Sequence, residues 1–190
     1  MKSSYKIILA SNSPRRKELL AGLDIPFEVV VKQGIDETYP DNLPSEEVPV
    51  YLSQLKAAAY HDTMTSDELV LTADTVVIVD DMILEKPNNS VEAYRMLSLL
   101  SGRNHQVVTG VSLTTLQKQR SFKVTTEVTF KELSDAEINY YVERYKPYDK
   151  AGAYGIQEWI GYVGVTSLKG SYFNVMGLPV QRIYEELLHF

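Results

Sequence analysis

Apolar runs and stretches of helical spacing alternate along the chain. Residues 6–10 form an apolar run that predicts a buried strand, and a helix is expected to begin just after it. Ser13 is a favourable N-cap, and Pro14 suits the first helical position because the N–H that proline lacks would have no partner there. Gly22 is expected to close this helix in a left-handed conformation.

The later segments follow the same alternation. Strand patterns occur at residues 27–31, 69–79, 106–116 and 121–130, and Asp80-Asp81 predicts a tight turn into a short strand at 82–84. Helices are expected from Val48 to Ala59, from Asn89 to Gly102, from Ser134 to Tyr145 and from Pro179 onward. Residues 147–161 and 170–178 are rich in glycine and aromatic residues, which is typical of site loops or closely packed crossings. Interleaved strands and helices predict an α/β fold with a mixed sheet.

Composition narrows the class of protein. At 190 residues the chain can form one sizeable core or two lobes that share a sheet. A formal net charge of −6 argues against a general nucleic-acid or membrane-surface binder. The absence of cysteine excludes disulfides, thiolate catalysis and cysteine metal sites. The sequence has neither a signal-peptide pattern nor an apolar run of spanning length, so a cytoplasmic protein is expected.

Two adjacent arginines lie where the first strand meets the first helix. Arg15 and Arg16 fall in the first helical turn, at the positive end of the helix dipole, where each cation costs about 0.3 kcal/mol or more. Together with the hydroxyls of Ser11 and Ser13 and the free backbone N–H groups, they favour an anion, above all a phosphate. The alternative is that both arginines are solvated or pair with surface acids.

Asp74 interrupts the most strand-like run of the chain. Aspartate is depleted in strands, and a charge in so apolar a run is costly unless it is paired or bound to a metal. A strand-end carboxylate that accepts backbone N–H groups would explain it, as would an exposed edge position. A general base or a metal ligand is the hypothesis that we favour.

Other polar residues are individually weak candidates. Glu37 follows Asp36 in a polar loop and could bind a divalent metal through oxygen, or could simply be solvated. Lys56 and Lys86 would by default be surface lysines, although Pro87 keeps the backbone before it extended and could hold the Lys86 amine in place.

Gln157 and the histidines complete the set of candidates. Gln157 could read a base edge through its amide or cap backbone groups of its own loop. The three histidines are scattered without metal-ligand spacing, and His105 is expected to be structural. Neither a P-loop nor a Rossmann glycine pattern occurs.

Taken together, these segments resemble the Maf family of nucleoside triphosphate pyrophosphatases, once called septum formation inhibitors. The resemblance spans nearly the whole chain in family order. The stretches that carry it are 10–16, 35–37, 73–77, 86–87, 100–102, 105–110, 149–157, 170–175 and 177–179.

The resemblance implies a fold and an activity. The fold would be similar to that of the inosine triphosphate pyrophosphatases, with a long, mixed, twisted sheet, flanking helices and a cleft between two lobes. Residues 1–190 would form a single catalytic domain, often found as a homodimer. The activity would be hydrolysis of a nucleoside triphosphate to the monophosphate and pyrophosphate, with a divalent cation such as magnesium or manganese.

The resemblance also implies roles for individual residues. Asp74 resembles the proton acceptor of the family, and Ser11, Arg15, Lys56 and Lys86 resemble phosphate-contacting positions, the two lysines being counted as catalytic. Glu37, with Asp74, is the candidate metal site. Three residues match the positions associated with the subgroup that acts on dTTP and UTP rather than 7-methyl-GTP: Arg16, Thr75 and Gln157. Glu85 and Glu158 stand where the family usually has glycine. The local backbone conformation is therefore expected to differ there, but no proposed catalytic group is lost.

The sequence leaves two alternative functions and one geometric question open. The chain could be a nucleotide-binding regulator of cell division that acts through a protein partner, or a sugar-phosphate or phosphomonoester hydrolase. In a regular strand Asp74 and Thr75 point to opposite faces, yet the resemblance asks both to serve one site. We therefore expect the strand to end or bulge at this point.

Overall fold

The computed structural model describes residues 5–190. Its strands are β1 (Lys6–Leu9), β2 (Phe27–Val29), β3 (Glu68–Val79), β4 (Met82–Leu84), β5 (Asn104–Thr114), β6 (Gln119–Phe130) and β7 (Val165–Lys169). Its helices are α1 (Pro14–Ala21), α2 (Val48–Ala58), α3 (Ser90–Leu100), α4 (Asp135–Tyr145), the 3-10 turn η1 (Ala151–Ala153), α5 (Trp159–Gly164), α6 (Tyr172–Met176) and α7 (Val180–Leu188).

The strands form a seven-stranded sheet of mixed direction. Their order is β2-β1-β3-β5-β6-β7, and β4 pairs with β3 beside this path. Strand β1 runs parallel to β2 and to β3, whereas β4 is antiparallel to β3 and β7 is antiparallel to β6. The predicted α/β class, with a mixed sheet and flanking helices, is confirmed.

The chain divides into two compact units. Unit 1 comprises Met1–Asp74, Thr109–Val124 and Gly177–Phe190, and unit 2 comprises Thr75–Val108 and Thr125–Met176. Strands β3, β5 and β6 each contribute residues to both units. Among residues 5–190, none of the helices has the length and apolar character that crossing a bilayer requires.

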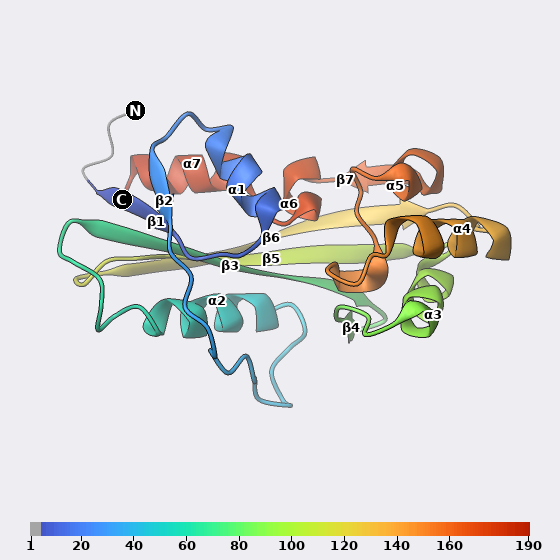
Figure 1. Cartoon of the computed structure of the whole chain (residues 1–190), viewed down its shortest axis with the longest axis horizontal. Helices are drawn as coiled ribbons and strands as arrows, with labels where there is room; N and C mark the ends of the chain where they lie inside the picture. The colour runs from blue at the N-terminus through green and yellow to red at the C-terminus, as the bar shows by residue number, and fades with distance from the viewer. Residues whose placement is uncertain (1–4) are drawn as a thin grey trace. The chain divides into compact units, whose positions relative to one another are not determined.

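In unit 1, helix α2 covers one face of the strands, and α1 and α7 cover the other (Figure 1). Helix α2 lies very close to β5, because Gly110 has no side chain: a Cβ there would meet the carbonyl carbon of Pro49 at 2.2 Å. A hydroxyl contact reinforces this approach, since Ser53 Oγ on α2 lies 2.8 Å from Ser112 Oγ on β5. This packing fixes the height of α2, and therefore of its lysine, Lys56, above the sheet.

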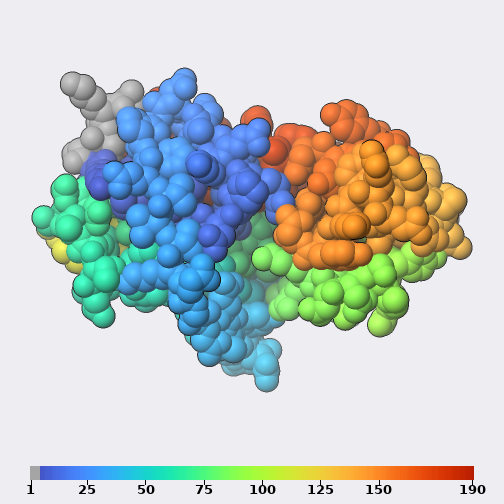
Figure 2. Space-filling view, in the orientation of Figure 1, coloured from blue at the N-terminus to red at the C-terminus, as the bar shows by residue number. Residues whose placement is uncertain are grey.

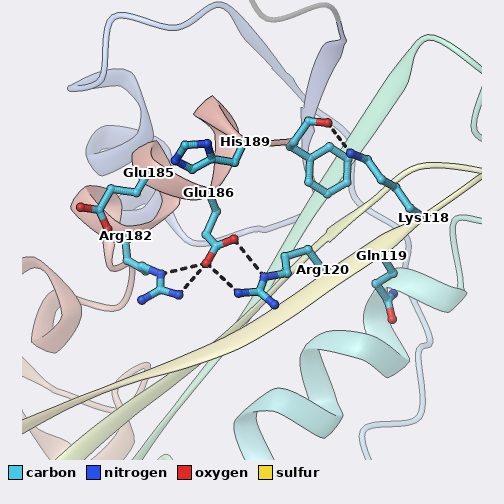
Figure 3. Close-up of a pocket in the computed structure, with 8 residues that line it drawn as sticks. Lys118, Gln119, Arg120, Arg182, Glu185, Glu186 and His189 are labelled. Carbon is cyan, nitrogen blue, oxygen red and sulfur yellow. Dashed lines mark hydrogen bonds and ion pairs between the residues drawn. The ribbon is translucent and has the colours of Figure 1, made fainter.

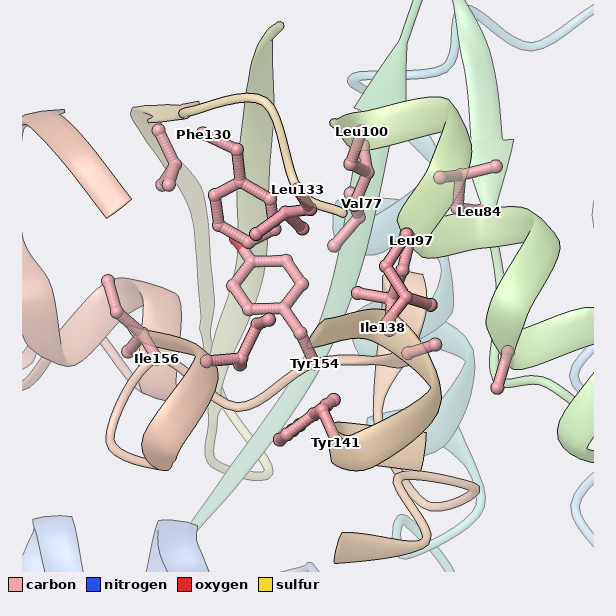
Figure 4. Close-up of a cluster of buried hydrophobic side chains, with 14 of the residues drawn as sticks. Val77, Leu84, Leu97, Leu100, Phe130, Leu133, Ile138, Tyr141, Tyr154 and Ile156 are labelled. Carbon is pink, nitrogen blue, oxygen red and sulfur yellow. The ribbon is translucent and has the colours of Figure 1, made fainter. Parts of the chain in front are cut away.

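Unit 2 has its own apolar core, in which α3 and α4 pack against each other (Figure 4). Aromatic rings form its centre: Phe130 and Tyr154 meet edge to face with their centroids 4.9 Å apart. Tyr141 of α4 is fully buried and stacks on Tyr145 at 5.0 Å. The loop that follows α4 is thus held by ring packing despite its glycines.

Local signals in the sequence account for several element boundaries. The side chain of Ser13 caps α1, and Ser134 with Glu137 forms a complete capping box on α4. Asp80 and Asp81 both have positive φ values, 49° and 62°, as expected for the tight turn of the β3–β4 hairpin. The expectation for Gly22 is wrong: its φ is −65°, and the left-handed residue is Asp24, two positions later. The helix-like turn therefore continues through Gly22 before the chain reverses.

Candidate active site

The connection between β1 and α1 is organised by its two serine hydroxyls. Ser13 Oγ accepts the N–H of Arg16 at 3.4 Å, and Ser11 Oγ accepts the N–H of Ser13 at 3.2 Å. Both hydroxyls therefore shape the turn into the helix. They hold Arg15 and Arg16 in the first helical turn, where the sequence places them.

Arg16 is a structural bridge as well as a cation. Its Nε donates to the carbonyl of Gly177 at 2.8 Å, and its Nη1 donates to the carbonyl of Ala73 at 2.7 Å. Burial lowers the pKa of the Arg16 guanidinium, and the nearby carboxylate of Asp74 opposes this shift. Arg16 thus ties α1 to β3, one residue before Asp74, and to the segment that precedes α7.

The carboxylate of Asp74 is paired with an ammonium from α2. Lys56 Nζ lies 2.6 Å from Asp74 Oδ1, and the two side chains are only 14% and 15% exposed. The same Nζ lies 2.8 Å from Glu37 Oε2, whose side chain is 52% exposed. Glu37 reaches Lys56 from a polar loop, residues 33–44, which stands largely exposed at the surface (Figure 2). The residue types that looked weak singly therefore form one cluster of two acids and a lysine.

Strand β3 continues through Asp74. Its pairing with β1 reaches Leu71, and its pairing with β4 begins at Val77. Between these two partners, the carbonyl of Ala73 is bound by Arg16. Of the two expectations for this point, an end of the strand is wrong, because β3 runs from Glu68 to Val79. Asp74 and Thr75 are both half-buried in an otherwise buried run.

The donor set of this cluster suits a divalent metal only in part. Within residues 5–190, no group of three or more histidine and acidic residues is arranged to hold a metal ion. The two carboxylates on Lys56 could supply two oxygen ligands. Magnesium in phosphate-handling sites is commonly bound by one or two carboxylates together with oxygens of the substrate. Glu37 and Asp74 could therefore bind a metal ion together with substrate oxygens, but they are too few to supply all of its ligands.

The remaining predicted residues belong to unit 2. Thr75 follows Asp74 on β3 and is half-buried, and Lys86 is exposed just after β4. Gln157 is half-buried in the turn before α5, and its Oε1 is a buried atom without a hydrogen-bond partner in the described part of the chain. The structure thus brings together Arg16, Glu37, Lys56 and Asp74, with Ser11 in the adjoining turn. Thr75, Lys86 and Gln157 all belong to unit 2.

His105 is buried, in keeping with the structural role expected for it. Its Nε2 lies 2.7 Å from the hydroxyl of Tyr154, and its ring packs edge to face on Phe130. Burial lowers the pKa of His105 to about 4. The ring is therefore neutral at physiological pH and serves the core of unit 2.

A separate pocket of about 680 Å³ lies in unit 1 between β6 and α7 (Figure 3). Its arginines converge on one acid: Arg120 Nε lies 2.9 Å from Glu186 Oε2, and Arg182 Nη2 lies 2.6 Å from Glu186 Oε1. None of the predicted site residues lines this pocket. Both arginines are already paired with Glu186, so the pocket offers less to an anion than its composition suggests.

Sequence reasoning missed a group of polar residues around Gln157. Lys150 Nζ lies 3.1 Å from Glu158 Oε1, and the hydroxyl of Tyr141 donates to Glu158 Oε2. Tyr141 lies in the helix expected from Ser134 to Tyr145, and no polar role is assigned to it from the sequence. A signal was present: Lys150 and Glu158 are charged residues at either end of a glycine-rich, apolar segment, where unpaired charges would be costly.

Known proteins match nearly the whole length of the chain. A sequence profile of the family described as Maf-like protein matches residues 6–190. A protein from Phocaeicola vulgatus named dTTP/UTP pyrophosphatase is 64% identical over 183 residues, which cover 96% of this chain and 95% of that protein. One of the same name from Parabacteroides distasonis is 59% identical over 186 residues, which cover 98% and 96%. A solved nucleoside-triphosphatase from Mycobacterium abscessus, described as dITP/XTP pyrophosphatase, has a TM-score of 0.45 and 14% identity, covering 95% of this chain and 93% of that one. Since the family profile spans almost the whole sequence and the relatives exceed half identity, the chain belongs to the Maf-like protein family.

Proposed function

We propose that this protein is a nucleoside triphosphate pyrophosphatase that hydrolyses dTTP and UTP to the monophosphate and pyrophosphate. The observation that carries the proposal is the Lys56–Asp74 pair, in which a largely buried ammonium from α2 lies 2.6 Å from a largely buried carboxylate on β3. Relatives at 64% and 59% identity that bear the name dTTP/UTP pyrophosphatase support the choice of reaction and substrate.

In this proposal Asp74 is the proton acceptor. Water attacks the α-phosphorus in line with the departing pyrophosphate, and its proton passes to the carboxylate. Because Lys56 already engages Oδ1, the proton goes to Oδ2. Phosphoryl transfer depends mainly on positioning and on neutralising the charge that develops on the phosphate oxygens. Lys56, Lys86 and Arg15 would neutralise that charge, and Ser11 would contact the phosphates from the turn before α1.

A divalent cation, magnesium or manganese, completes the proposal. When bound, it would neutralise phosphate charge as a Lewis acid. Glu37 and Asp74 would hold it together with phosphate oxygens of the nucleotide. Lys56 would then exchange part of its contact with these carboxylates for contact with the phosphates.

Gln157 is the proposed base-reading residue. Its buried Oε1 lacks a hydrogen-bond donor within the described chain, and a buried acceptor left unpaired is unfavourable. The imide N–H of thymine and uracil is a donor of the matching kind, whereas cytosine carries an acceptor at the same ring position. Arg16 and Thr75 would complete the pyrimidine site, Arg16 through the rigid bridge to Ala73 and Gly177.

The organisation implied by the family is part of the same proposal. We propose that residues 1–190 act as a single catalytic domain in a cytoplasmic homodimer, with a house-cleaning role toward canonical or modified pyrimidine nucleotides. No observation favours the regulator of cell division over this enzyme.

One experiment tests the proposal directly. The purified protein is incubated with dTTP, UTP, CTP, GTP and 7-methyl-GTP in magnesium or manganese, and the products are separated. Pyrophosphate and monophosphate formed fastest from dTTP and UTP would support it. Orthophosphate release would instead indicate a phosphomonoesterase-type reaction, and nucleotide binding without product would indicate a regulator; either result would overturn the proposal.

A further inference from the structure

Gln157 occupies the middle of a tight turn. The N–H of Glu158 donates to the carbonyl of Gly155 at 3.0 Å, which closes a turn over Ile156 and Gln157. The N–H of Gly161 in turn donates to the carbonyl of Glu158 at 2.9 Å, at the start of α5. The direction of the Gln157 side chain therefore depends on where Gly155 and Glu158 are held.

Both ends of this turn are fastened to one phenol. The hydroxyl of Tyr141 accepts the N–H of Gly155 at 3.0 Å and donates to the carboxylate of Glu158. Tyr141 itself is fully buried in the core of unit 2, on α4 (Figure 4). The turn is thus clamped to a helix by a single atom that acts as acceptor at one end and donor at the other.

Lys150 adds a second contact to Glu158. The Tyr141 hydroxyl with its contacts to Gly155 and Glu158 is called the clamp. Lys150 Nζ lies 3.1 Å from Glu158 Oε1, and the side chains are only 10% and 21% exposed. Gly155 makes room for this contact, since a Cβ there would lie 3.0 Å from both Lys150 Cε and Glu158 Cδ. Glu158 therefore uses one carboxylate oxygen for Tyr141 and the other for Lys150.

We propose that Tyr141, Glu158 and Lys150 are positioning residues that aim the amide of Gln157 at the base and thereby set the preference for thymine and uracil. This inference rests on the proposed function and names the machinery behind its base selectivity. Burial raises the pKa of the Tyr141 hydroxyl, and the bond to Glu158 adds to the shift, so the phenol keeps the proton that it donates. The same arrangement explains why a glutamate is accommodated directly after Gln157.

The test compares variants that remove single atoms. Tyr141→Phe deletes the shared hydroxyl and keeps the ring. We expect KM for dTTP and UTP to rise about five- to tenfold, the effect of losing a hydrogen bond or two, with kcat within about twofold of the wild type. The ratio of kcat/KM for UTP to that for CTP should fall by about the same factor, because a loosened Gln157 no longer distinguishes the two bases.

Two further variants keep the test decisive. Tyr145→Phe is the matched control, because Tyr145 stacks on Tyr141 and its hydroxyl has no hydrogen-bond partner among the described residues; it should leave KM and selectivity unchanged. Glu158→Gln retains an acceptor for Tyr141 but removes the ion pair with Lys150. It should give the same change at about a third of the size, and it replaces Tyr141→Phe if that variant does not fold.

A double-mutant cycle separates positioning from a general loss of structure. If Tyr141 acts through Gln157, Tyr141→Phe should add nothing to the KM and selectivity defects of Gln157→Ala. Additive defects, or wild-type selectivity in both Tyr141→Phe and Glu158→Gln, would overturn the inference. The proposed function would still stand in that case, provided that the wild-type protein releases pyrophosphate. A wild-type protein that releases no pyrophosphate would overturn both.

Discussion

Lys56 and Asp74 meet through an Nζ–Oδ1 contact of 2.6 Å, although one residue lies on α2 and the other in the middle of β3. Neither charge is isolated, and neither is fully solvated. Such a pair persists because each partner compensates the desolvation of the other, and removing one partner leaves an uncompensated charge. A substitution at Lys56 or Asp74 therefore tests the chemistry without unfolding the protein only if the new side chain keeps the shape of the old one and the hydrogen bond between the two positions.

Asp74→Asn meets that condition. The amide oxygen can still accept from Lys56, but it cannot take a proton from water, so turnover of dTTP should fall about 1,000-fold, within the range for loss of a general base. Nucleotide affinity, measured by calorimetry, should change less than about threefold, in keeping with a change confined to one protonation site. Asp67→Asn, the same change just before β3, should leave turnover unaltered. A near wild-type rate in Asp74→Asn would remove the base assignment.

Glu37→Gln tests the proposed metal site. Glu37 contacts Lys56 at 2.8 Å but is half exposed, so the fold should tolerate the amide. Loss of one carboxylate ligand should raise the magnesium concentration needed for half-maximal activity about tenfold, the lower end of the range for weakened metal shells. Chelation by EDTA should abolish the activity of the wild type. An unchanged magnesium activation curve in Glu37→Gln would exclude Glu37 as a ligand.

Arg16→Lys tests the bridge between α1 and β3. A lysine keeps the charge but lacks the planar fork that donates to both Gly177 and Ala73, so at least one carbonyl loses its donor. The free energy of unfolding in urea should fall by about 2 kcal/mol. Arg95→Lys, on the exposed side of α3, is the control and should change it by less than about 0.5 kcal/mol. Equal stabilities for the two variants would contradict a bridging role.

Gly110→Ala tests the close approach of α2 to β5. The added Cβ would lie 2.2 Å from the carbonyl carbon of Pro49, and backbone cannot yield as a flexible side chain does. The free energy of unfolding should fall by about 3 kcal/mol or more, at the upper end for overpacking. Since α2 carries Lys56, kcat should fall as well. Gly22→Ala, with a φ of −65° and its nearest contact at 3.3 Å, should change stability by less than about 1 kcal/mol.

His105 predicts a dependence of stability on pH. Burial lowers its pKa from 6.5 to about 4 in the folded protein, so between these values the unfolded chain binds more protons. Stability conferred by the neutral ring is therefore complete above pH 6.5 and is lost as the pH falls toward 4. The loss should amount to about 3 kcal/mol. Urea unfolding of wild type and His105→Gln at pH 7 and pH 4.5 isolates it, and parallel pH dependences would refute the assignment.

The sequence predicted elements whose signals are local. Ser13 with Pro14, Ser134 with Glu137, and Asp80 with Asp81 each specify a cap or a turn within four residues, and all three appear in the structure. Helices α5 and α6 were missed because they have only six and five residues, and Glu158, the N-cap residue of α5, makes no side-chain capping hydrogen bond. Gly161 looked like a loop residue, yet its missing side chain permits a close crossing: a Cβ there would lie 1.8 Å from the carbonyl oxygen of Ile156.

The site was predictable in its residues and not in its contacts. Asp74 stood out because a charge in an apolar strand demands a partner, but nothing near it in sequence identifies Lys56. Arg16 was interpreted as an anion-binding cation, and its acceptors, Ala73 and Gly177, lie 57 and 161 residues away. Backbone carbonyls leave no mark in the sequence, so a bridge of this kind emerges only from the fold.

The clamp on the Gln157 turn closes on the hydroxyl of Tyr141, whose pKa burial raises above its ordinary value. That hydroxyl stays protonated and uncharged in neutral and acidic solution, whereas an imidazole in the same place would become charged as the pH falls. The contact between the Tyr141 hydroxyl and the N–H of Gly155 therefore does not depend on a group that changes its charge between neutral and acidic solution.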